Sequence, residues 1–319
     1  ATLGCGTATS ENSFLVWRGV MGITEALYYP TALALLASHY SEGARSKALG
    51  FHQSGMYVGV LAGGWYGGWA ADNWGWRQGF LVAACAGIAY SVVLWWGVRG
   101  SGVSAEAASA RSEGSVAALF RSRCYVALSA AFAAFCAIQW IVLAWYPTFL
   151  QEKFGLSMTD SGWNATVFVQ VSQVLGIFGG SALADRLRKR WRPARLYVAA
   201  AGVFLSAPFA YLAFAAGTLW EARLASAGFG LFSGLLAANA FAAAYDVIGS
   251  GNRGLGGGLL NMMGGLSSAG MIYMAGIWKE TIGFAAMVLW MMGVSMGTAV
   301  LLAWVATRYK RECDSSVSS

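Results

Sequence analysis

The sequence is poor in charge and in the residues that most enzymes use for catalysis. Only 11% of its 319 residues are charged, against about 25% in an ordinary soluble domain. The chain has two histidines, His39 and His52, and neither has an acidic partner at a catalytic spacing. Neither the GxxxxGK[ST] nucleotide-binding loop nor the HExxH zinc motif occurs. These absences argue against an ATP-driven pump and a membrane hydrolase, and we predict that the protein is not an enzyme.

The sequence also lacks the patterns that would indicate a metal, cofactor or nucleic-acid site. The five cysteines are scattered, and no CxxC or Cys/His spacing suggests a metal. We therefore expect no metal and no cofactor. The net charge is +7, but no basic stripe is interleaved with aromatic residues, so we expect no nucleic-acid partner.

Long apolar runs are abundant instead. Hydrophobic residues make up 57% of the chain, and nine runs are long enough for a membrane-spanning helix of about 20 residues. A soluble helical domain would expose a charged face on each helix, and these runs do not. The sequence therefore predicts an all-α polytopic membrane protein that contacts the lipid bilayer. The predicted spans are 13–39, 46–70, 77–98, 124–150, 163–184, 195–217, 222–248, 254–278 and 282–307.

The basic residues are distributed as expected for a membrane protein. With the turn SEGARSK placed in the cytoplasm, 16 of the 21 Lys and Arg residues lie inside. Four lie outside, and Arg18 falls within a span. Because cytoplasmic loops carry an excess of Lys and Arg, we predict a plasma (inner) membrane protein with a cytoplasmic C-terminus. The four outside residues are Arg77, Lys153, Arg223 and Lys279.

One long polar segment divides the chain into two related parts. Three spans precede residues 99–123 and six follow them, and an offset of 208 aligns Gly22 with Gly230 and Arg45 with Arg253. Two six-helix halves are typical of secondary transporters. We expect the remainder of an N-terminal bundle at 1–98, a cytoplasmic loop at 99–123, a C-terminal bundle at 124–307 and a tail at 308–319. On this interpretation about two and a half helices are missing before residue 1.

Several motifs resemble the major facilitator superfamily (MFS). They are RGVMGITEALYYP, RSKALG, GWRQGF, WYPTFLQEKFGLS and GGSALADRLRKR. The last is similar to a cytoplasmic motif of the family, but Ser181 and Arg188 stand where that motif has glycine. The resemblance implies two six-helix bundles, with the chain beginning near the end of the third helix of twelve. Arg18 and Glu25 are similar to the Spinster-like branch, whereas other motifs fit organic-anion and sugar-phosphate branches equally well.

The resemblance implies a monomeric secondary transporter that moves a small organic solute by alternating access. An anionic solute and proton coupling are the expected details. Two alternatives stay open, namely an MFS-like membrane sensor or receptor, and a lipid or amphiphile transporter of the Spinster-like type. The sequence identifies neither the substrate nor the coupling ion.

The stretch from Val16 to Pro30 contains the strongest candidate for a substrate or proton site. Arg18 and Glu25 are seven residues apart, so they share one face of a helix, about 10.5 Å apart along its axis. A charge near mid-bilayer costs at least about 2.5–3.5 kcal/mol, so the pair needs a partner or a wet cavity. Arg18 offers a fork for a carboxylate or phosphate, and Glu25 can exchange a proton. A structural ion pair with the missing helices is the alternative interpretation.

Other polar residues are predicted to line the same pathway or to form a cytoplasmic gate. The further pathway candidates are His52, Gln53, Gln139, Trp140, Asn239 and Asn261. The gate candidates are Arg45, Asp185, Arg186, Arg188 and Arg253. Gly55, Gly59 and Gly63, with Gly64 and Gly68, are spaced for close helix packing.

Overall fold

Helices account for nearly all of the residues that the structure describes. The structure is a computed structural model that describes residues 1–39, 42–98, 115–191, 193–248 and 252–308. Its elements are α1 (Thr2–Thr7), α2 (Glu11–His39), α3 (Glu42–Asn73), α4 (Trp76–Val98), α5 (Val116–Arg121), α6 (Arg123–Phe154), α7 (Met158–Arg188), α8 (Ala194–Ala215), α9 (Leu219–Val247), α10 (Arg253–Trp278) and α11 (Gly283–Arg308).

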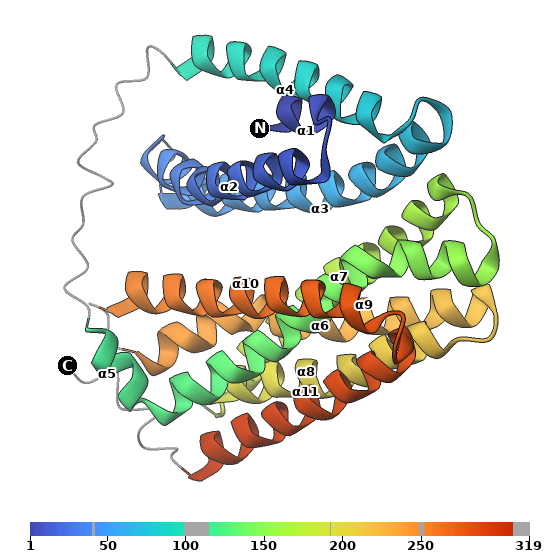
Figure 1. The fold of residues 1–319 in the computed structure, drawn as a ribbon. Coiled ribbons are helices and arrows are strands. Elements are labelled where there is room, and N and C mark those ends of the chain that lie inside the picture. The colour runs from blue at the N-terminus through green and yellow to red at the C-terminus, as the bar shows by residue number, and fades with distance from the viewer. Residues whose placement is uncertain (40–41, 99–114, 192, 249–251, 309–319) are drawn as a thin grey trace. The chain divides into compact units, whose positions relative to one another are not determined.

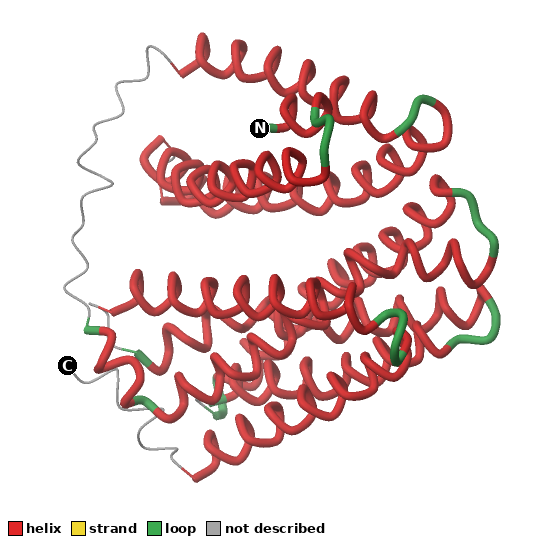
Figure 2. The backbone as a smooth tube through the Cα atoms, viewed as in Figure 1, coloured by secondary structure: helices red, strands yellow, loops and turns green. Residues whose placement is uncertain are grey.

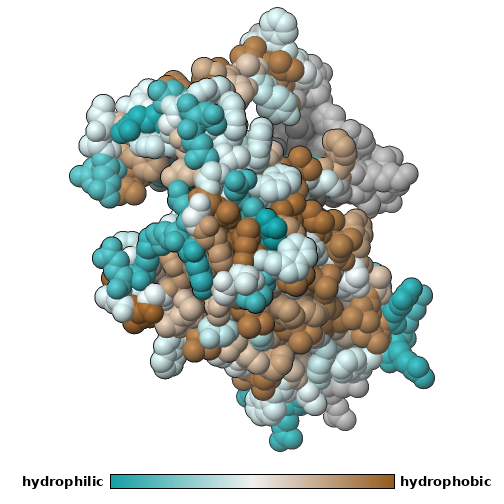
Figure 3. Space-filling model, turned by 90° about the vertical axis from the view of Figure 1, so that its right-hand side faces the viewer, coloured by the Kyte–Doolittle hydropathy of each residue, from teal (hydrophilic) through white to brown (hydrophobic). Residues whose placement is uncertain are grey.

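The nine long helices coincide with the nine predicted spans, and the described residues contain no strand. Six of them, α4, α6, α7, α8, α9 and α11, are long and apolar enough to cross a membrane. Apolar side chains cover much of the face seen in Figure 3, as expected of a surface in contact with lipid. The prediction of an all-α membrane protein is confirmed. Most of the predicted loop 99–123 and nearly all of the tail 308–319 lie outside the described residues.

The chain forms two compact units, which are described separately (Figure 1). The first contains residues 1–111 together with Ser157–Trp163, so it includes α1 to α4 and the first turns of α7. The second contains residues 112–156 and 164–319.

Short polar contacts at helix ends hold the first unit together. Helix α1 packs on α2 and α4. The Arg77 guanidinium donates to the Ala8 carbonyl at 3.4 Å and lies 4.2 Å from the centre of the Trp76 ring. At the turn between α3 and α4, the Tyr66 hydroxyl donates to the Gly79 carbonyl at 2.9 Å. Arg77, which the sequence analysis predicted to lie on the outer side of the membrane, therefore joins α4 to the segment after α1.

Asp72, at the end of α3, caps the first turn of α7. Its carboxylate accepts from the Met158 N–H at 3.2 Å and from the N–H and hydroxyl of Thr159 at 2.7 and 2.6 Å. The hydrogen bonds from Thr159 hold the pKa of the Asp72 carboxyl below its usual range. One turn away in α3, Gly68 lies against the Met158 backbone, where a Cβ atom would overlap. Gly68 thus packs closely, as the sequence predicted.

Gly55, Gly59 and Gly63 behave differently from Gly68. A Cβ atom on any of the three would meet no atom within 4 Å in the part of the chain that the structure describes. The described residues therefore show no close helix packing at these three glycines, although the sequence predicted it.

The second unit is built on two neighbouring apolar clusters. In Figures 1 and 2, α10 and α11 lie on either side of α6, and both pack against it. Helix α8 packs against α9 and α11. Two buried tyrosines of α6 join distant helices, since the Tyr125 hydroxyl donates to the Gly256 carbonyl at 2.7 Å and the Tyr146 hydroxyl to the Ala222 carbonyl at 2.9 Å. These bonds satisfy polar groups within otherwise apolar clusters.

Helices α7 and α9 cross through two pairs of glycines. Gly176 and Gly180 of α7 lie against α9, Gly230 and Gly234 of α9 lie against α7, and all four are buried. A Cβ atom on Gly176 would overlap the Leu231 carbonyl oxygen, and one on Gly230 would overlap that of Val169. Each helix thus presents glycines four residues apart, the spacing that lets membrane helices approach most closely.

Candidate substrate pathway and charge cluster

Arg18 and Glu25 are both exposed on α2. The four ion pairs found among the described residues involve neither of them. Their separation of seven residues places them on one face of the helix. Neither group forms an ion pair within the described residues, and the alternative interpretation, a structural ion pair with the missing helices, stays open. A guanidinium and a carboxylate are left accessible on a membrane helix.

Tyr28, the next residue after Glu25 on this face, connects α2 to His52, which was predicted to line the pathway. Tyr28 follows Glu25 by three positions, so their side chains are neighbours on the helix. The Tyr28 hydroxyl lies 3.2 Å from Nε2 of His52 on α3, within hydrogen-bonding distance, and the two ring centres are 6.0 Å apart. Sequence reasoning missed Tyr28, because its partner lies 24 positions away. The structure describes α3 at Arg45 and Gln53 but not their side chains.

The polar candidates of the second unit have different surroundings. The Gln139 Oε1 atom is buried and has no hydrogen-bond partner among the described residues. Trp140, next along α6, is half-exposed, and Asn261 of α10 is exposed. Asn239 is buried, and its amide nitrogen donates to the carbonyls of Leu235 at 2.9 Å and Gly180 at 3.3 Å. Asn239 therefore fastens α9 to α7, while Gln139 keeps an acceptor available.

Arg223 of α9 is a further polar group that the sequence did not single out. Its Nε atom donates to Asn164 Oδ1 of α7 at 2.7 Å, and its guanidinium lies 5.7 Å from the centre of the Phe168 ring. The sequence analysis predicted only that Arg223 lies on the outer side of the membrane. Its position between two helices adds a second contact between α7 and α9.

Four charged side chains from three helices meet at one end of the second unit. Arg195, in the first turn of α8, pairs with Asp246 of α9 at 3.1 Å and with Asp185 of α7 at 3.3 Å. Arg188 pairs with the same Asp246 at 2.9 Å. We call Asp185, Arg188, Arg195 and Asp246 the charge cluster. It joins the ends of α7, α8 and α9.

The charge cluster includes only part of the predicted gate. Asp185 and Arg188 belong to it, whereas Arg186 is exposed and makes none of its ion pairs. The side chain of Arg253 lies outside the description. Asp246 and Arg195 were missed, because Asp246 is far from the family-like motif and Arg195 was counted only as a basic anchor.

One sequence pattern of a hydrolase does occur, in α11. The pentapeptide GVSMG, residues 293–297, matches the GxSxG nucleophile pattern. In hydrolases that serine sits on a sharp turn between a strand and a helix. Ser295 instead lies in the middle of a continuous 26-residue helix. The pattern therefore does not form a nucleophile elbow here.

Comparisons with known proteins match this architecture. The family model for the Major Facilitator Superfamily matches residues 1–271. The probable galactarate/D-glucarate transporter GudP of Bacillus subtilis is 23% identical over 278 residues, covering 79% of this chain and 60% of that protein. The D-galactonate transporter of Escherichia coli O6:H1 is 26% identical over 215 residues, covering 60% of this chain and 50% of that protein. The chain thus spans about half to three fifths of the length of these relatives.

Solved structures agree at the level of the fold. Two crystal structures of a bacterial homolog to the human lysosomal transporter Spinster, both inward-facing, have TM-scores of 0.68 and 0.69 to this chain. Each is 18% identical to it, and the match covers 98% of this chain and 79% or 80% of the other. The relatives named above are transporters rather than enzymes, as the sequence led us to expect. With a family model matching most of its length, the chain belongs to the Major Facilitator Superfamily.

Proposed function

We propose that the complete protein is a proton-coupled secondary transporter that moves a small organic acid by alternating access. In this proposal it acts as a monomer in the plasma membrane, with the C-terminus in the cytoplasm. The helical regions 1–98 and 124–307 belong to its N-terminal and C-terminal bundles, which the loop 99–123 joins. Family membership and two relatives named as transporters of galactarate/D-glucarate and of D-galactonate support an organic acid as the substrate class.

The observation that carries the proposal is the exposed pair Arg18 and Glu25 on α2. A charge in a membrane helix is costly unless it faces a partner or a water-filled cavity. No ion pair among the described residues compensates either group. A planar guanidinium binds a carboxylate through two parallel hydrogen bonds, which suits a sugar acid. A glutamate in such a cavity can take up and release a proton, and Tyr28, three positions further along α2, lies within hydrogen-bonding distance of His52.

Alternating access also needs contacts that form and break at the cytoplasmic side. The charge cluster provides carboxylates and guanidinium groups from α7, α8 and α9, and these can exchange partners at small cost. We assign it a gating role, together with Arg45, Arg186 and Arg253. In the second unit, the unpaired Gln139 oxygen can accept a hydrogen bond from a substrate hydroxyl.

Transport by the protein produced from its complete gene, in vesicles with an imposed pH gradient, tests the proposal. The unaltered protein should accumulate labelled galactonate or glucarate. Glu25→Gln keeps the size of the side chain but cannot cycle a proton, so accumulation should stop while exchange of internal for external substrate continues. Arg18→Lys keeps the charge but loses the fork, so apparent affinity should fall by about 1–3 kcal/mol. Glu11→Gln, in the first turn of the same helix, is the matched control and should behave like the unaltered protein.

Two outcomes would contradict the proposal. If both single variants lose thermal stability and a double neutral variant regains it with normal uptake, Arg18 and Glu25 form a structural pair. If the protein binds a sugar acid but never accumulates or exchanges it, the protein is a sensor.

A further inference from the structure

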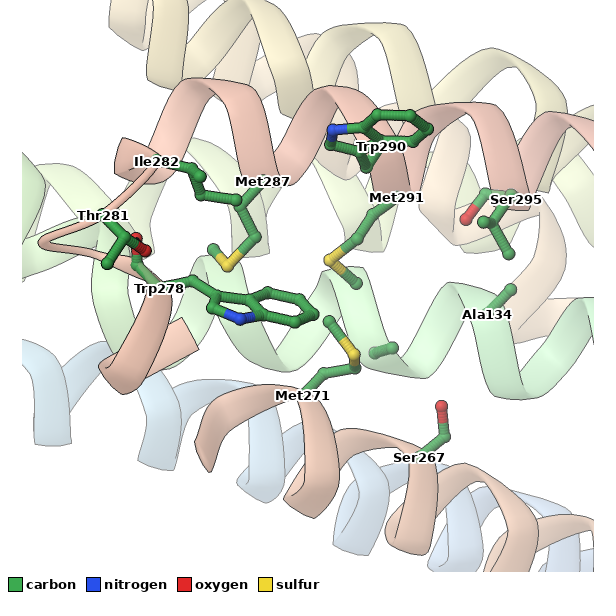
Figure 4. A pocket seen from close by; sticks show the side chains of 12 residues that line it. Ala134, Ser267, Met271, Trp278, Thr281, Ile282, Met287, Trp290, Met291 and Ser295 are labelled. Atoms are coloured by element: carbon green, nitrogen blue, oxygen red, sulfur yellow. The ribbon is translucent and has the colours of Figure 1, made fainter. Parts of the chain in front are cut away.

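The second unit contains a cavity of about 640 Å³ that the candidate pathway does not use. It lies among α6, α10 and α11. Helices α10 and α11 both pack on α6 but make few contacts with each other, so a space is left between them. Figure 4 shows the side chains of α11 on one side of it, those of α10 on the other, and α6 behind. Cavities of this size hold small ligands.

The lining of the cavity is almost entirely apolar. None of the described residues that line it is charged, and three methionines, Met271, Met287 and Met291, lie along its middle (Figure 4). Two of its three hydroxyl groups are already hydrogen-bonded to backbone carbonyls, those of Ser267 at 3.0 Å and Thr281 at 3.2 Å. The cavity therefore offers an occupant dispersion contacts and little hydrogen bonding. Methionine side chains adapt their shape to flexible apolar ligands.

The length of the cavity matches one leaflet of a bilayer. One end is formed by Trp278, Thr281 and Ile282, at the turn between α10 and α11, and the other by Ser295 in the middle of α11 (Figure 4). From Gly283 to Ser295 the helix rises about 18 Å at 1.5 Å per residue. Half of a hydrocarbon core of 30 Å is about 15 Å. The stretch of α11 that lines the cavity is therefore about as long as one leaflet is thick.

The cavity also communicates with the surface of the helices. Trp290 and Val294, both in its lining, are 76% and 61% exposed. Exposed apolar side chains on a membrane-spanning helix contact lipid hydrocarbon. At the turn, the Lys279 ammonium group is paired with Glu152 and lies 5.8 Å from the centre of the Trp145 ring. Lysine and tryptophan at one level are typical of the interface where lipid headgroups lie.

From this match of length, polarity and access, we propose that the cavity is a binding site for one acyl chain of a bilayer phospholipid. The headgroup lies at the turn between α10 and α11, and the end of the chain reaches Ser295. The Ser295 hydroxyl is buried and has no hydrogen-bond partner among the described residues. Because an acyl chain binds through hydrocarbon contacts alone, this hydroxyl has no role in recognising it. The site is separate from the proposed transport pathway and does not depend on the identity of the substrate.

Photolabelling in lipid nanodiscs tests this proposal. The probes are two phosphatidylethanolamines, one with a diazirine near the carbonyl of an acyl chain and one with it near the terminal methyl. After irradiation, mass spectrometry maps the labelled residues. The first probe should label Thr281 and Ile282, and the second should label Met291 and Ser295. No such order by depth, or labelling no stronger than that of exposed Val300 on the same helix, would overturn the proposal.

Variants sharpen the test. Ala134→Phe fills the cavity from α6 and should abolish the enrichment of label, and Ala134→Leu, a smaller change, should reduce it. Val300→Phe, at an exposed position of α11 that does not line the cavity, is the matched control and should leave the enrichment unchanged. Ser295→Ala should also leave it unchanged. A loss of labelling with Ser295→Ala would overturn the proposal, because the occupant would then be a ligand with a polar group at that end.

Discussion

At the scale of single residues, the charge cluster depends most on Asp246. It accepts from two arginines of different helices, whereas Asp185 accepts from one of them. The side chains of Arg195 and Asp246 are 21% and 26% exposed, and that of Asp185 is 64% exposed. Because solvent weakens an exposed ion pair, the two carboxylates should contribute unequally although the sequence gives them the same charge.

We expect Asp246→Asn to lower the free energy of unfolding more than Asp185→Asn does. Each exposed pair contributes about 0.2–1 kcal/mol, so losing two of them costs on the order of 1 kcal/mol, and losing the Asp185 pair costs less. Thermal unfolding of the purified variants measures the difference. A double-mutant cycle between Asp246 and Arg195 should give a non-zero coupling energy, and a cycle between Asp246 and exposed Arg186 should give none. Equal effects of the two aspartate variants would contradict this view of the cluster.

At the scale of helices, the second unit depends on how closely α7 and α9 approach. The four glycines at their crossing leave no room for a Cβ atom, because the backbone of one helix lies directly against that of the other. Membrane helices have no hydrophobic drive to associate within lipid and rely on such packing. The hydrogen bonds of Asn239 and Arg223 across the same pair can form only if this distance is kept.

Gly176→Ala should therefore destabilise the protein by about 1–3 kcal/mol, the usual cost of overpacking. Its added Cβ atom would overlap the Leu231 carbonyl oxygen, so the helices must separate. Gly179→Ala is a matched control three residues away, where a Cβ atom meets nothing within 4 Å. It should be neutral or stabilising by up to about 1 kcal/mol, because alanine favours a helix. Thermal melts compare the stability of the two variants. Equal melting temperatures would rule out tight packing at Gly176.

The cap on the first turn of α7 should respond to acid. The pKa of Asp72 is lowered in the folded protein, so its contribution to stability is present at pH values above its ordinary pKa. That contribution is lost as the pH falls through the lowered value, and the transition should therefore lie below about pH 4. Hydrogen exchange of the Met158 and Thr159 amides, corrected for intrinsic rates, measures it. Asp72→Ala should leave these amides weakly protected at every pH, and protection that persists in this variant would contradict the role of the cap.

At the scale of the whole molecule, the distribution of basic residues is the main evidence for orientation. Lys153 is exposed near the end of α6, and Lys189 is exposed directly after α7. Helix α7 follows α6 in the chain, and as the next predicted span it crosses the membrane in the opposite direction. The two lysines should therefore lie on opposite sides of the membrane. Because cytoplasmic loops carry an excess of Lys and Arg, we predict that Lys189 lies inside.

Labelling of intact cells checks the orientation. In a background without native cysteines, Lys153→Cys should react with an impermeant maleimide from outside, and Lys189→Cys only after permeabilisation. The reverse pattern would overturn the orientation and the cytoplasmic position of the charge cluster. Reaction of both without permeabilisation would show that the segment between them does not cross the membrane.

The sequence by itself determined the class of protein, the number and position of the long helices, and the family resemblance. These properties follow from local composition, because a run of apolar residues predicts a membrane helix whatever that helix contacts. Arg18, Glu25, Asp185 and Arg188 could also be found in this way, since charge is conspicuous in an apolar chain. Their roles stay predictions.

Only the tertiary structure decided which residues meet. Asp246 and Arg195 join Asp185, Tyr28 meets His52, and Gly176 of α7 meets Gly234 of α9, although their spacing in the chain indicates none of this. It also left Gly55, Gly59 and Gly63 without a described contact and opened a cavity where α10 and α11 separate over α6. The physical reason is that a membrane helix forms from its own hydrogen bonds and the thickness of the bilayer. Its contacts depend on which face meets another helix, and hydropathy does not specify that face.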